Sequence, residues 1–248
     1  MKILMTCSKC LFDSEKQSPK PEFNLVNYDD ELCEGKCSKG HVTYTRIQND
    51  KYELLFDAAV MAFYDSYYRE CVLNISSCLE SFYEYAIKIL LFIKKKEKMS
   101  DIEKFYKNIK SRSECREGVF QALSRIYLNK DYFLDDKNRS LRNNTIHNGY
   151  FPKEKETKEY INRVYEIIYD FFKSLKTNTQ DLEFVDFGFA MQAKVFNKHS
   201  DKFYSNMYIP TILSESTITG NFEKDLESFK QRAGYCYNKK IWKIDRHF

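Results

Sequence analysis

Turn-forming residues are scarce in this sequence. Only 7 glycines and 4 prolines occur among the 248 residues. A many-stranded β architecture needs frequent tight turns, which these residue types supply most readily. Their scarcity argues against such an architecture and favours long helices. With 43% hydrophobic residues, including 20 Phe and 19 Tyr, the chain has enough apolar material for a packed core.

The sequence also lacks long apolar segments. Its most apolar run, residues 87–93, is too short to span a bilayer and is followed by lysines. Near the N-terminus, Lys2 precedes only Ile3, Leu4 and Met5, which is far less than the apolar region of a signal peptide. We therefore expect a cytoplasmic protein without a membrane partner. In that compartment the 8 cysteines are expected to be reduced thiols or metal ligands and not disulfides.

A strong excess of charge is missing as well. The formal net charge is +4, from 40 basic and 36 acidic residues. That value is too small to identify a nucleic-acid-binding protein, for which a clustered basic face is the signature. A loose basic cluster at Lys107, Lys110, Arg112 and Arg116 could guide a phosphate backbone, although surface charge of this density is ordinary.

Cysteines and one histidine are concentrated in the first residues of the chain. Cys7 and Cys10 form a C-x2-C pair, and a second group of ligand-type residues follows at Cys33, Cys37 and His41. Two such pairs about twenty residues apart are typical of a structural zinc ribbon, in which four ligands close a tetrahedron. We favour Cys7, Cys10, Cys37 and His41 as the zinc ligands, with Cys33 as an alternative ligand in the second pair.

Two further features support this module. The run from Cys37 to His41 resembles the C-x-x-G-H knuckle of many bacterial zinc ribbons, and Gly40 supplies the permissive backbone that the turn needs. Short β-branched or apolar runs at residues 3–6 and 42–45 predict small strands beside the two knuckles. We therefore expect residues 1–50 to form a zinc-ribbon-like module, which binds RNA, a partner or its own helical domain.

From Lys51 onward the apolar residues recur with the period of a helix. The clearest stripe predicts a helix near residues 67–95 whose core-facing residues are Val72, Ile75, Leu79, Phe82, Ala86, Ile89 and Ile93. Another helix is expected over residues 115–128, with Ile126 among its inward residues. Asp135 is placed to cap a further helix, and Pro152 fits the first turn of the last long one. Residues 51–176 are therefore expected to form a helical bundle.

A short polar stretch near the end of this region carries an arginine and a histidine five residues apart, at Arg142 and His147. Arginine offers a planar, permanently charged fork suited to phosphate, and histidine exchanges a proton near neutral pH. On a helix, five residues separate two side chains by about 140° and about 7.5 Å. The pair therefore fits a helix end or loop that lines a cleft, and Gly149 and Pro152 stop the helix soon after. The alternative interpretation is an arginine on a solvent-exposed helix face and a histidine that caps the last turn, with no chemical role for either.

The order Arg142, Asn143, three further residues and His147 resembles the R-x4–6-H motif of HEPN domains. These are small all-helical domains of many prokaryotic toxins and defence ribonucleases. The resemblance covers about residues 51–176 and implies an HEPN-like helical bundle there. The expected N-terminal zinc ribbon and a short α/β C-terminal extension lie outside it, and the whole chain is expected to have a mainly α fold.

The resemblance also implies an activity and an assembly. It suggests a metal-independent endoribonuclease, a toxin or antiviral-defence effector, in which two copies of the motif meet across a homodimer. Arg142 would hold the phosphate and His147 would move the proton. Asn143 and Tyr150 would position the substrate or the imidazole, and Glu80 would orient the cations from the neighbouring helix. An antitoxin or other regulatory protein would be a further partner.

A different class of function also fits the motif. A non-catalytic HEPN module could bind a nucleotide, an RNA or a partner without cleaving it. Such a module needs a cation for phosphate but no group that transfers protons. The presence of both Arg142 and His147 therefore favours the enzyme.

The last part of the chain, residues 177–248, is expected to be an α/β extension. Apolar residues between Phe184 and Val195 suggest extended structure, and a short helix is expected after Asn221. The aromatic tail that ends at Trp242 and Phe248 is expected to pack on the body or on a second subunit, although it could also stack on bases.

Overall fold

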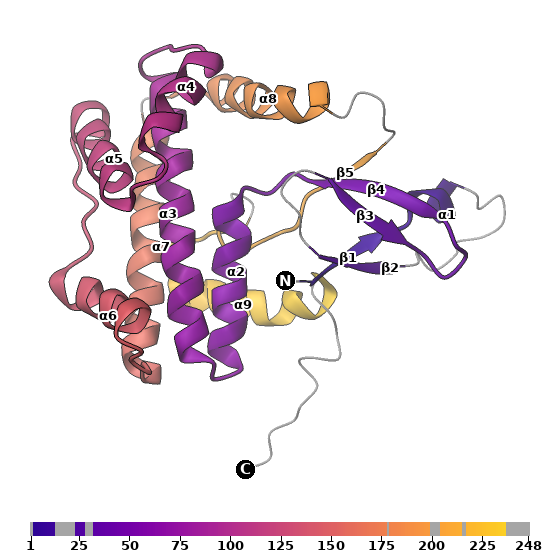
Figure 1. The fold of residues 1–248 in the computed structure, drawn as a ribbon, viewed down its shortest axis with the longest axis horizontal. Coiled ribbons are helices and arrows are strands. Elements are labelled where there is room, and N and C mark those ends of the chain that lie inside the picture. The colour runs from indigo at the N-terminus through magenta and orange to yellow at the C-terminus, as the bar shows by residue number, and fades with distance from the viewer. Residues whose placement is uncertain are drawn as a thin grey trace. The chain divides into compact units, whose positions relative to one another are not determined.

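The computed structural model of this protein describes residues 2–12, 23–27, 32–177, 179–198, 204–214 and 217–236. The structure is mainly helical, with five short strands in the described part (Figure 1). The chain divides into two compact units. The described residues before 50, from 195 to 210 and after 222 form one unit, here called the sheet unit. Residues 50–194 and 211–222 form the other, here called the helical unit.

The sheet unit contains all the described strands. β1 (Lys2–Thr6) pairs antiparallel with β2 (Phe23–Asn27), and the short helix α1 (Ser8–Phe12) follows β1. β3 (Cys33–Lys36) pairs antiparallel with β4 (Val42–Ile47). The strands expected beside the two knuckles, at residues 3–6 and 42–45, are therefore confirmed.

A strand from much later in the chain completes the second sheet. β5 (Ser205–Met207) lies parallel to β4, and the hydroxyl oxygens of Thr45 and Ser205 are 3.0 Å apart. After β4 and β5, the side chain of Asn49 makes two hydrogen bonds with the backbone of Ile209. Its Nδ2 donates to the carbonyl at 2.8 Å, and its Oδ1 accepts from the N–H at 2.7 Å. The sheet unit is therefore built from both parts of the chain.

The helical unit is organised around its longest helix, α3 (Tyr68–Ile93). A three-residue turn, in which Ser66 has a φ of 64°, joins α3 to the preceding helix. Figure 1 shows α2, α4, α5, α6 and α7 lying around α3. In chain order its other helices are α2 (Lys51–Tyr64), α4 (Met99–Ile109), α5 (Ser113–Leu128), α6 (Asp136–His147), α7 (Glu154–Lys176) and most of α8 (Asp181–Lys198). The last described helix, α9 (Phe222–Cys236), belongs almost entirely to the sheet unit.

The core of this unit is formed by the stripe that the sequence predicts on α3. Every member of the stripe, from Val72 to Ile93, is buried. At its centre, the ring of Phe82 lies 5.5 Å from that of Tyr52, 5.8 Å from that of Phe120 and 5.2 Å from that of Phe171. Aromatic pairs at such distances contribute about 0.5–1.5 kcal/mol each beyond the area they bury. α3 is thereby fixed against α2, α5 and α7.

Three local predictions were wrong. Residues 184–195 are helical, within α8. Among the side chains described in this stretch, those of residues 184–193, Phe187 alone is deeply buried, and it packs against Tyr85 and Phe92. The other apolar side chains of residues 184–193 are half-buried or exposed, so they do not alternate into a core as those of a strand would. Ile126 of α5 is 69% exposed and does not face the core. Pro152 precedes the N-cap of α7, Lys153, and so lies just outside the first turn.

The expected C-terminal extension contributes to both units. The short helix predicted after Asn221 is confirmed as α9. Before it, Thr211 and Ile212 return to α2, where the N–H of Ile212 donates to Asp57 Oδ1 at 3.0 Å. Gly220 has a φ of +81°, and a Cβ there would lie 2.4 Å from the Tyr169 ring, so this position requires glycine. The aromatic tail at Trp242 and Phe248 lies outside the described residues.

Among the described residues, no helix combines the length and the apolar character that crossing a bilayer requires.

Candidate metal centre and candidate active site

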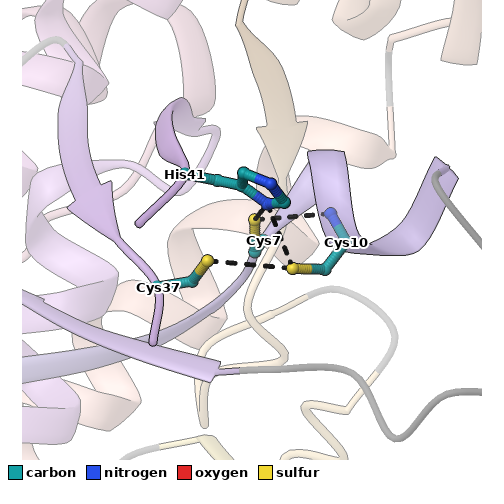
Figure 2. Close-up of side chains that lie close together, drawn as sticks. All are labelled: Cys7, Cys10, Cys37 and His41. Atoms are coloured by element: carbon teal, nitrogen blue, oxygen red, sulfur yellow. Dashed lines mark hydrogen bonds between the residues drawn. The ribbon is translucent and has the colours of Figure 1, made fainter. Parts of the chain in front are cut away.

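Four ligand-type side chains converge in the sheet unit (Figure 2). Cys7 follows β1 and Cys10 lies in α1, while Cys37 follows β3 and His41 precedes β4. The three thiols are buried, and one ligand atom of each residue lies within 4.8 Å of every other. This arrangement can hold a metal ion.

The distances within this cluster suit tetrahedral coordination. The Sγ atoms of Cys10 and Cys37 are 3.7 Å apart. Two thiolates bound to one zinc ion at about 2.3 Å would be separated by about 3.8 Å. The Nδ1 atom of His41 lies 3.3 Å from Cys10 Sγ and 3.9 Å from Cys7 Sγ. The imidazole therefore faces the thiols through Nδ1.

The backbone of each knuckle fixes this geometry. The N–H of Cys10 points at Cys7 Sγ at 3.5 Å. In the second knuckle the N–H of Gly40 donates to the carbonyl of Cys37 at 2.9 Å, and the N–H of Cys37 donates to the carbonyl of His41 at 3.0 Å. Gly40 has a φ of 82°, in the left-handed region that favours glycine. The local sequence thus sets the turn that brings His41 back to Cys37.

The thiols of the cluster differ in acidity. Burial, reinforced by hydrogen bonds with Cys7 and Cys37, raises the pKa of Cys10 to about 12. Burial alone would also raise the pKa of Cys37, but hydrogen bonds with the backbone of His41 and Lys39 outweigh it and lower that pKa. A coordinated thiol is deprotonated outright, so a bound cation would remove this difference.

Cys33 is not part of the cluster. It lies in β3, 2% exposed, with its backbone opposite Thr45 of β4. The preference for Cys37 and His41 over Cys33 therefore agrees with the geometry. Cys71 and Cys78 in α3 are fully buried, and desolvation raises the pKa of each thiol, so they are core residues as expected.

The arginine–histidine stretch forms helix α6 of the helical unit. Its N-cap is Asp135, as expected, whose Oδ1 accepts from the N–H of Asn138 at 2.9 Å. This hydrogen bond lowers the pKa of the Asp135 carboxyl. The helix ends at His147, and Gly149 turns the chain away with a φ of 66°. The motif therefore occupies the second half of one short, capped helix.

Arg142 reaches from α6 to α3. Its Nη2 donates to Glu80 Oε1 at 2.6 Å, and its Nη1 donates to Asn143 Oδ1 at 3.1 Å. The second oxygen of Glu80 accepts from Nη2 of Arg116, in α5, at 2.9 Å. One carboxylate on α3 thus binds two arginines from two other helices.

The other two predicted residues are not drawn into this contact. His147 is exposed, and within the described residues its ring has no hydrogen bond or ion pair. The hydroxyl of Tyr150 donates to Glu156 Oε1 at 2.9 Å, and this hydrogen bond raises the pKa of Tyr150. Because both motif residues lie on α6, the helical period turns Arg142 and His147 about 140° apart.

The structure therefore brings Glu80 and Asn143 to Arg142, and leaves His147 and Tyr150 outside that group. It also adds Arg116, which the sequence indicates only as one member of a loose basic cluster. No periodic pattern could have paired Arg116 with Arg142, since the two residues lie on different helices and meet only through Glu80.

Comparisons of this chain with protein-family models, with curated proteins and with solved structures find no match. Two groups of side chains in this chain have the chemistry of a functional site. One is a set of four residues that could hold a metal ion, and the other is a pair of arginines linked by a carboxylate, with an exposed histidine elsewhere on the same helix as Arg142.

Proposed function

We propose that this protein is a metal-independent endoribonuclease of HEPN type that acts as a toxin or antiviral-defence effector. The observation that carries the proposal is the placement of Arg142. Its Nη2 atom donates to Glu80 Oε1 at 2.6 Å. Arg142 lies on α6, the helix that ends at the exposed His147. An oriented cation for phosphate and an accessible proton-transfer group are the parts that RNA cleavage needs.

RNA carries its own nucleophile, so the protein has little covalent chemistry to supply. The 2′-oxygen attacks the adjacent phosphorus, the 5′-oxygen leaves, and a proton moves from the first oxygen to the second. We assign this proton transfer to His147 as general base or acid, which typically contributes about 10²–10⁴-fold. Arg142 binds the scissile phosphate and offsets the charge that develops on it. The products are a 2′,3′-cyclic phosphate and a 5′-hydroxyl.

The remaining residues have supporting roles in this proposal. Glu80 orients Arg142, and Asn143, which accepts from the same guanidinium at 3.1 Å, limits its rotation. The hydroxyl of Tyr150 gives up its hydrogen bond with Glu156 and contacts the substrate instead. Arg142 and His147 of one chain face directions about 140° apart. We therefore propose a homodimer in which the motif of a second copy completes the cleft.

The metal in the sheet unit is proposed to be zinc with a structural role. Three thiolates and one imidazole are a common zinc ligand set, and four protein ligands fill a tetrahedral shell. No position is then left for a substrate or a water, so the RNA chemistry does not pass through this ion.

A cleavage assay with a metal chelator tests this function. Wild-type protein should cut a structured RNA in the presence of EDTA and leave a 2′,3′-cyclic phosphate. His147→Ala should abolish cleavage, and Arg142→Lys should do the same because lysine keeps the charge but loses the planar fork. Zinc content is measured in parallel, so that loss of the structural ion is not mistaken for loss of a catalytic one. Equal cutting of DNA would contradict the mechanism.

One observation favours the second candidate, a non-catalytic module that binds RNA or a nucleotide. Within one chain His147 is not brought to Arg142, so a monomer would present a phosphate-binding cation without its proton-transfer group. In that case Arg142→Ala would weaken RNA binding, His147→Ala would leave it unchanged, and the wild-type protein would cut nothing.

A further inference from the structure

Glu80 shares its two carboxylate oxygens between two arginines. Arg142 Nη2 is 2.6 Å from Oε1, and Arg116 Nη2 is 2.9 Å from Oε2. The side chains of Arg116, Arg142 and Glu80 are 18%, 24% and 30% exposed, so the group is shielded but still open to solvent. α5 and α6 therefore each present one guanidinium group to the same carboxylate of α3, at a partly solvent-exposed position.

This group carries one positive charge more than its carboxylate can balance. The neighbouring ion pair does not offset this excess charge, because Glu117 Oε1 already pairs with Arg139 Nη2 at 2.7 Å. A single phosphodiester group carries one negative charge. It would neutralise the excess without any change in Glu80.

Another ion cluster on the same helix has the opposite sign. Lys88 of α3 is buried and contacts two carboxylates, Glu84 at 2.6 Å and Glu103 at 2.8 Å. There a cation is over-compensated, as expected for a buried charge that serves packing. At Glu80 the cations are in excess and stay partly exposed, which is the arrangement that an anionic ligand needs.

Arg116 also has donors to spare. A guanidinium has five N–H groups, and the ion pair with Glu80 is made through Nη2. Within the part of the chain that the structure describes, the buried Nε of Arg116 has no hydrogen-bond partner. Arginine forks match the paired oxygens of carboxylates and of phosphates alike. Each arginine contacts Glu80 through one Nη2 atom, so a phosphate placed against their partly exposed ends would meet terminal N–H groups that these two contacts leave over.

We propose that Arg116 and Arg142 form a two-arginine clamp for one phosphodiester group of RNA, with Glu80 as their shared anchor. Arg116 is thus a substrate-binding residue that lies outside the Arg142–His147 motif. The identity of the ligand rests on the proposed function, whereas the clamp itself rests on the charges and distances around Glu80.

Binding of an RNA that cannot be cleaved tests the clamp directly. The probe is a fluorescein-labelled 2′-O-methyl oligoribonucleotide, which lacks the attacking hydroxyl, and its anisotropy is measured over a series of salt concentrations. Arg116→Ala and Arg142→Ala should each weaken binding by about 10- to 100-fold. Each should also reduce the slope of log K against log salt by about 0.7, the value for one lost phosphate contact on a single strand.

The matched control is Arg125→Ala. Arg125 lies on the same helix, α5, but it is more exposed and pairs with Asp131. This variant should bind the probe within about twofold of wild type, as expected for an exposed ion pair that makes no contact with the ligand. Far-UV circular dichroism and a melting curve check that each variant is folded. If Arg116→Ala is unfolded, Arg116→Gln takes its place.

A double variant separates direct contact from an indirect effect through Glu80. If Arg116 touches phosphate, Arg116→Ala should weaken binding further in an Arg142→Ala background and lower the salt slope again. If Arg116 only helps Glu80 to position Arg142, the second substitution should change nothing, and the clamp is wrong. Wild-type affinity and slope in Arg116→Ala, or no binding of the probe to the wild-type protein, would overturn it as well.

Cleavage of unmodified RNA is measured separately, so the two proposals can fail independently. Arginine-dependent binding without any cleavage would support the clamp and reject the endoribonuclease. Cleavage by a protein whose probe binding ignores Arg116 would do the reverse.

Discussion

The two candidate sites of this molecule are built in opposite ways. In the sheet unit, four ligands from two tight turns lie within 4.8 Å of one another. In the helical unit, the two motif residues share one helix and therefore face directions about 140° apart. Turns can aim neighbouring side chains at one point, whereas a helix spreads them around its axis. A site carried on a helix must accordingly be completed by other helices, as Arg142 is by Glu80 and Arg116, or by a second copy of the chain.

Removing a metal ligand should have the largest effect and should be confined to the sheet unit. If the proposed zinc is bound, Cys37→Ser is expected to lose it, and structural zinc sites contribute an apparent free energy of about 10–16 kcal/mol to folding. Elemental analysis should find one zinc per wild-type chain and none in the variant, and hydrogen exchange should show lost protection in β3 and β4.

Cys33→Ser is the matched control, because Cys33 is equally buried but lies outside the cluster. It should keep its zinc. Loss of zinc from Cys33→Ser together with retention in Cys37→Ser would mean that the ligand set is wrong.

The next largest effect is expected from the exposed end of α6. His147→Ala should slow RNA cleavage by about 10²–10⁴-fold. Its melting temperature should stay within a few degrees of wild type, since exposed substitutions usually change stability by about 0.5 kcal/mol or less. Cleavage rates and melting curves of the same preparations check both statements.

Mixing two inactive variants sharpens the comparison. If a second copy completes the cleft, His147→Ala and Arg142→Ala subunits that exchange should recover part of the activity, because one mixed dimer holds an intact residue of each kind. Light scattering should show a dimer for both variants. No recovery from demonstrated mixed dimers would argue for a cleft made within one chain.

A smaller effect is expected at the shared anchor. Glu80→Ala should lower cleavage by about tenfold, mainly through kcat, because both arginines lose their orientation while keeping their charge. Glu80→Asp should recover part of this loss if positioning is the role. The ion pairs at Glu80 are partly exposed, so the cost to stability should be about 1 kcal/mol or less, measured by urea denaturation. A rise in KM with kcat unchanged would contradict a positioning role.

The smallest effect concerns the start of the same helix. Asp135→Ala removes the N-cap of α6 and should destabilise the protein by about 1 kcal/mol at pH 7. Asp135→Asn keeps an acceptor and should cost much less. The hydrogen bond from Asn138 lowers the pKa of Asp135.

The pH dependence of this cap follows from that shift. A carboxyl whose pKa is lowered by folding stabilises the protein fully above its unfolded value, about 3.9, and loses that contribution as the pH falls through the lower folded value. The difference between wild type and Asp135→Ala in urea denaturation should therefore be largest near neutral pH and shrink below about pH 4. An unchanged difference at pH 3 would show that the charge does not matter.

Local spacing was enough to predict the cluster of four ligand-type residues and the core. The choice of Cys37 and His41 over Cys33 followed from a short knuckle with a glycine at Gly40, and the geometry of the cluster agrees with it. The stripe on α3 was readable because helical periodicity repeats over many residues. In both cases the signal and the structure lie in the same stretch of sequence.

The features that sequence reasoning missed depend on contacts between distant segments. The parallel pairing of β5 with β4 joins residues about 160 positions apart, as Thr45 and Ser205 show. The dense apolar residues of 184–195 predict an extended segment, yet these residues lie in the helix α8, and among the side chains described there the deeply buried ring is that of Phe187, which contacts other helices. Arg116 likewise gains its significance only from Glu80, on another helix.

The pairing of β4 with β5 has a consequence for the order of events during synthesis. The helical unit is in effect an insertion within the sheet unit, since residues 50–194 separate the two segments that meet at Thr45 and Ser205. During synthesis the two cysteine knuckles emerge from the ribosome first. The edge of β4 that pairs with β5 stays unpaired until residues 205–209 have left the exit tunnel. A newly made chain thus holds an unpaired strand throughout the synthesis of its helices, and such edges attract other chains. Early metal binding at Cys7, Cys10, Cys37 and His41 would stabilise the N-terminal part of the newly made chain during that interval.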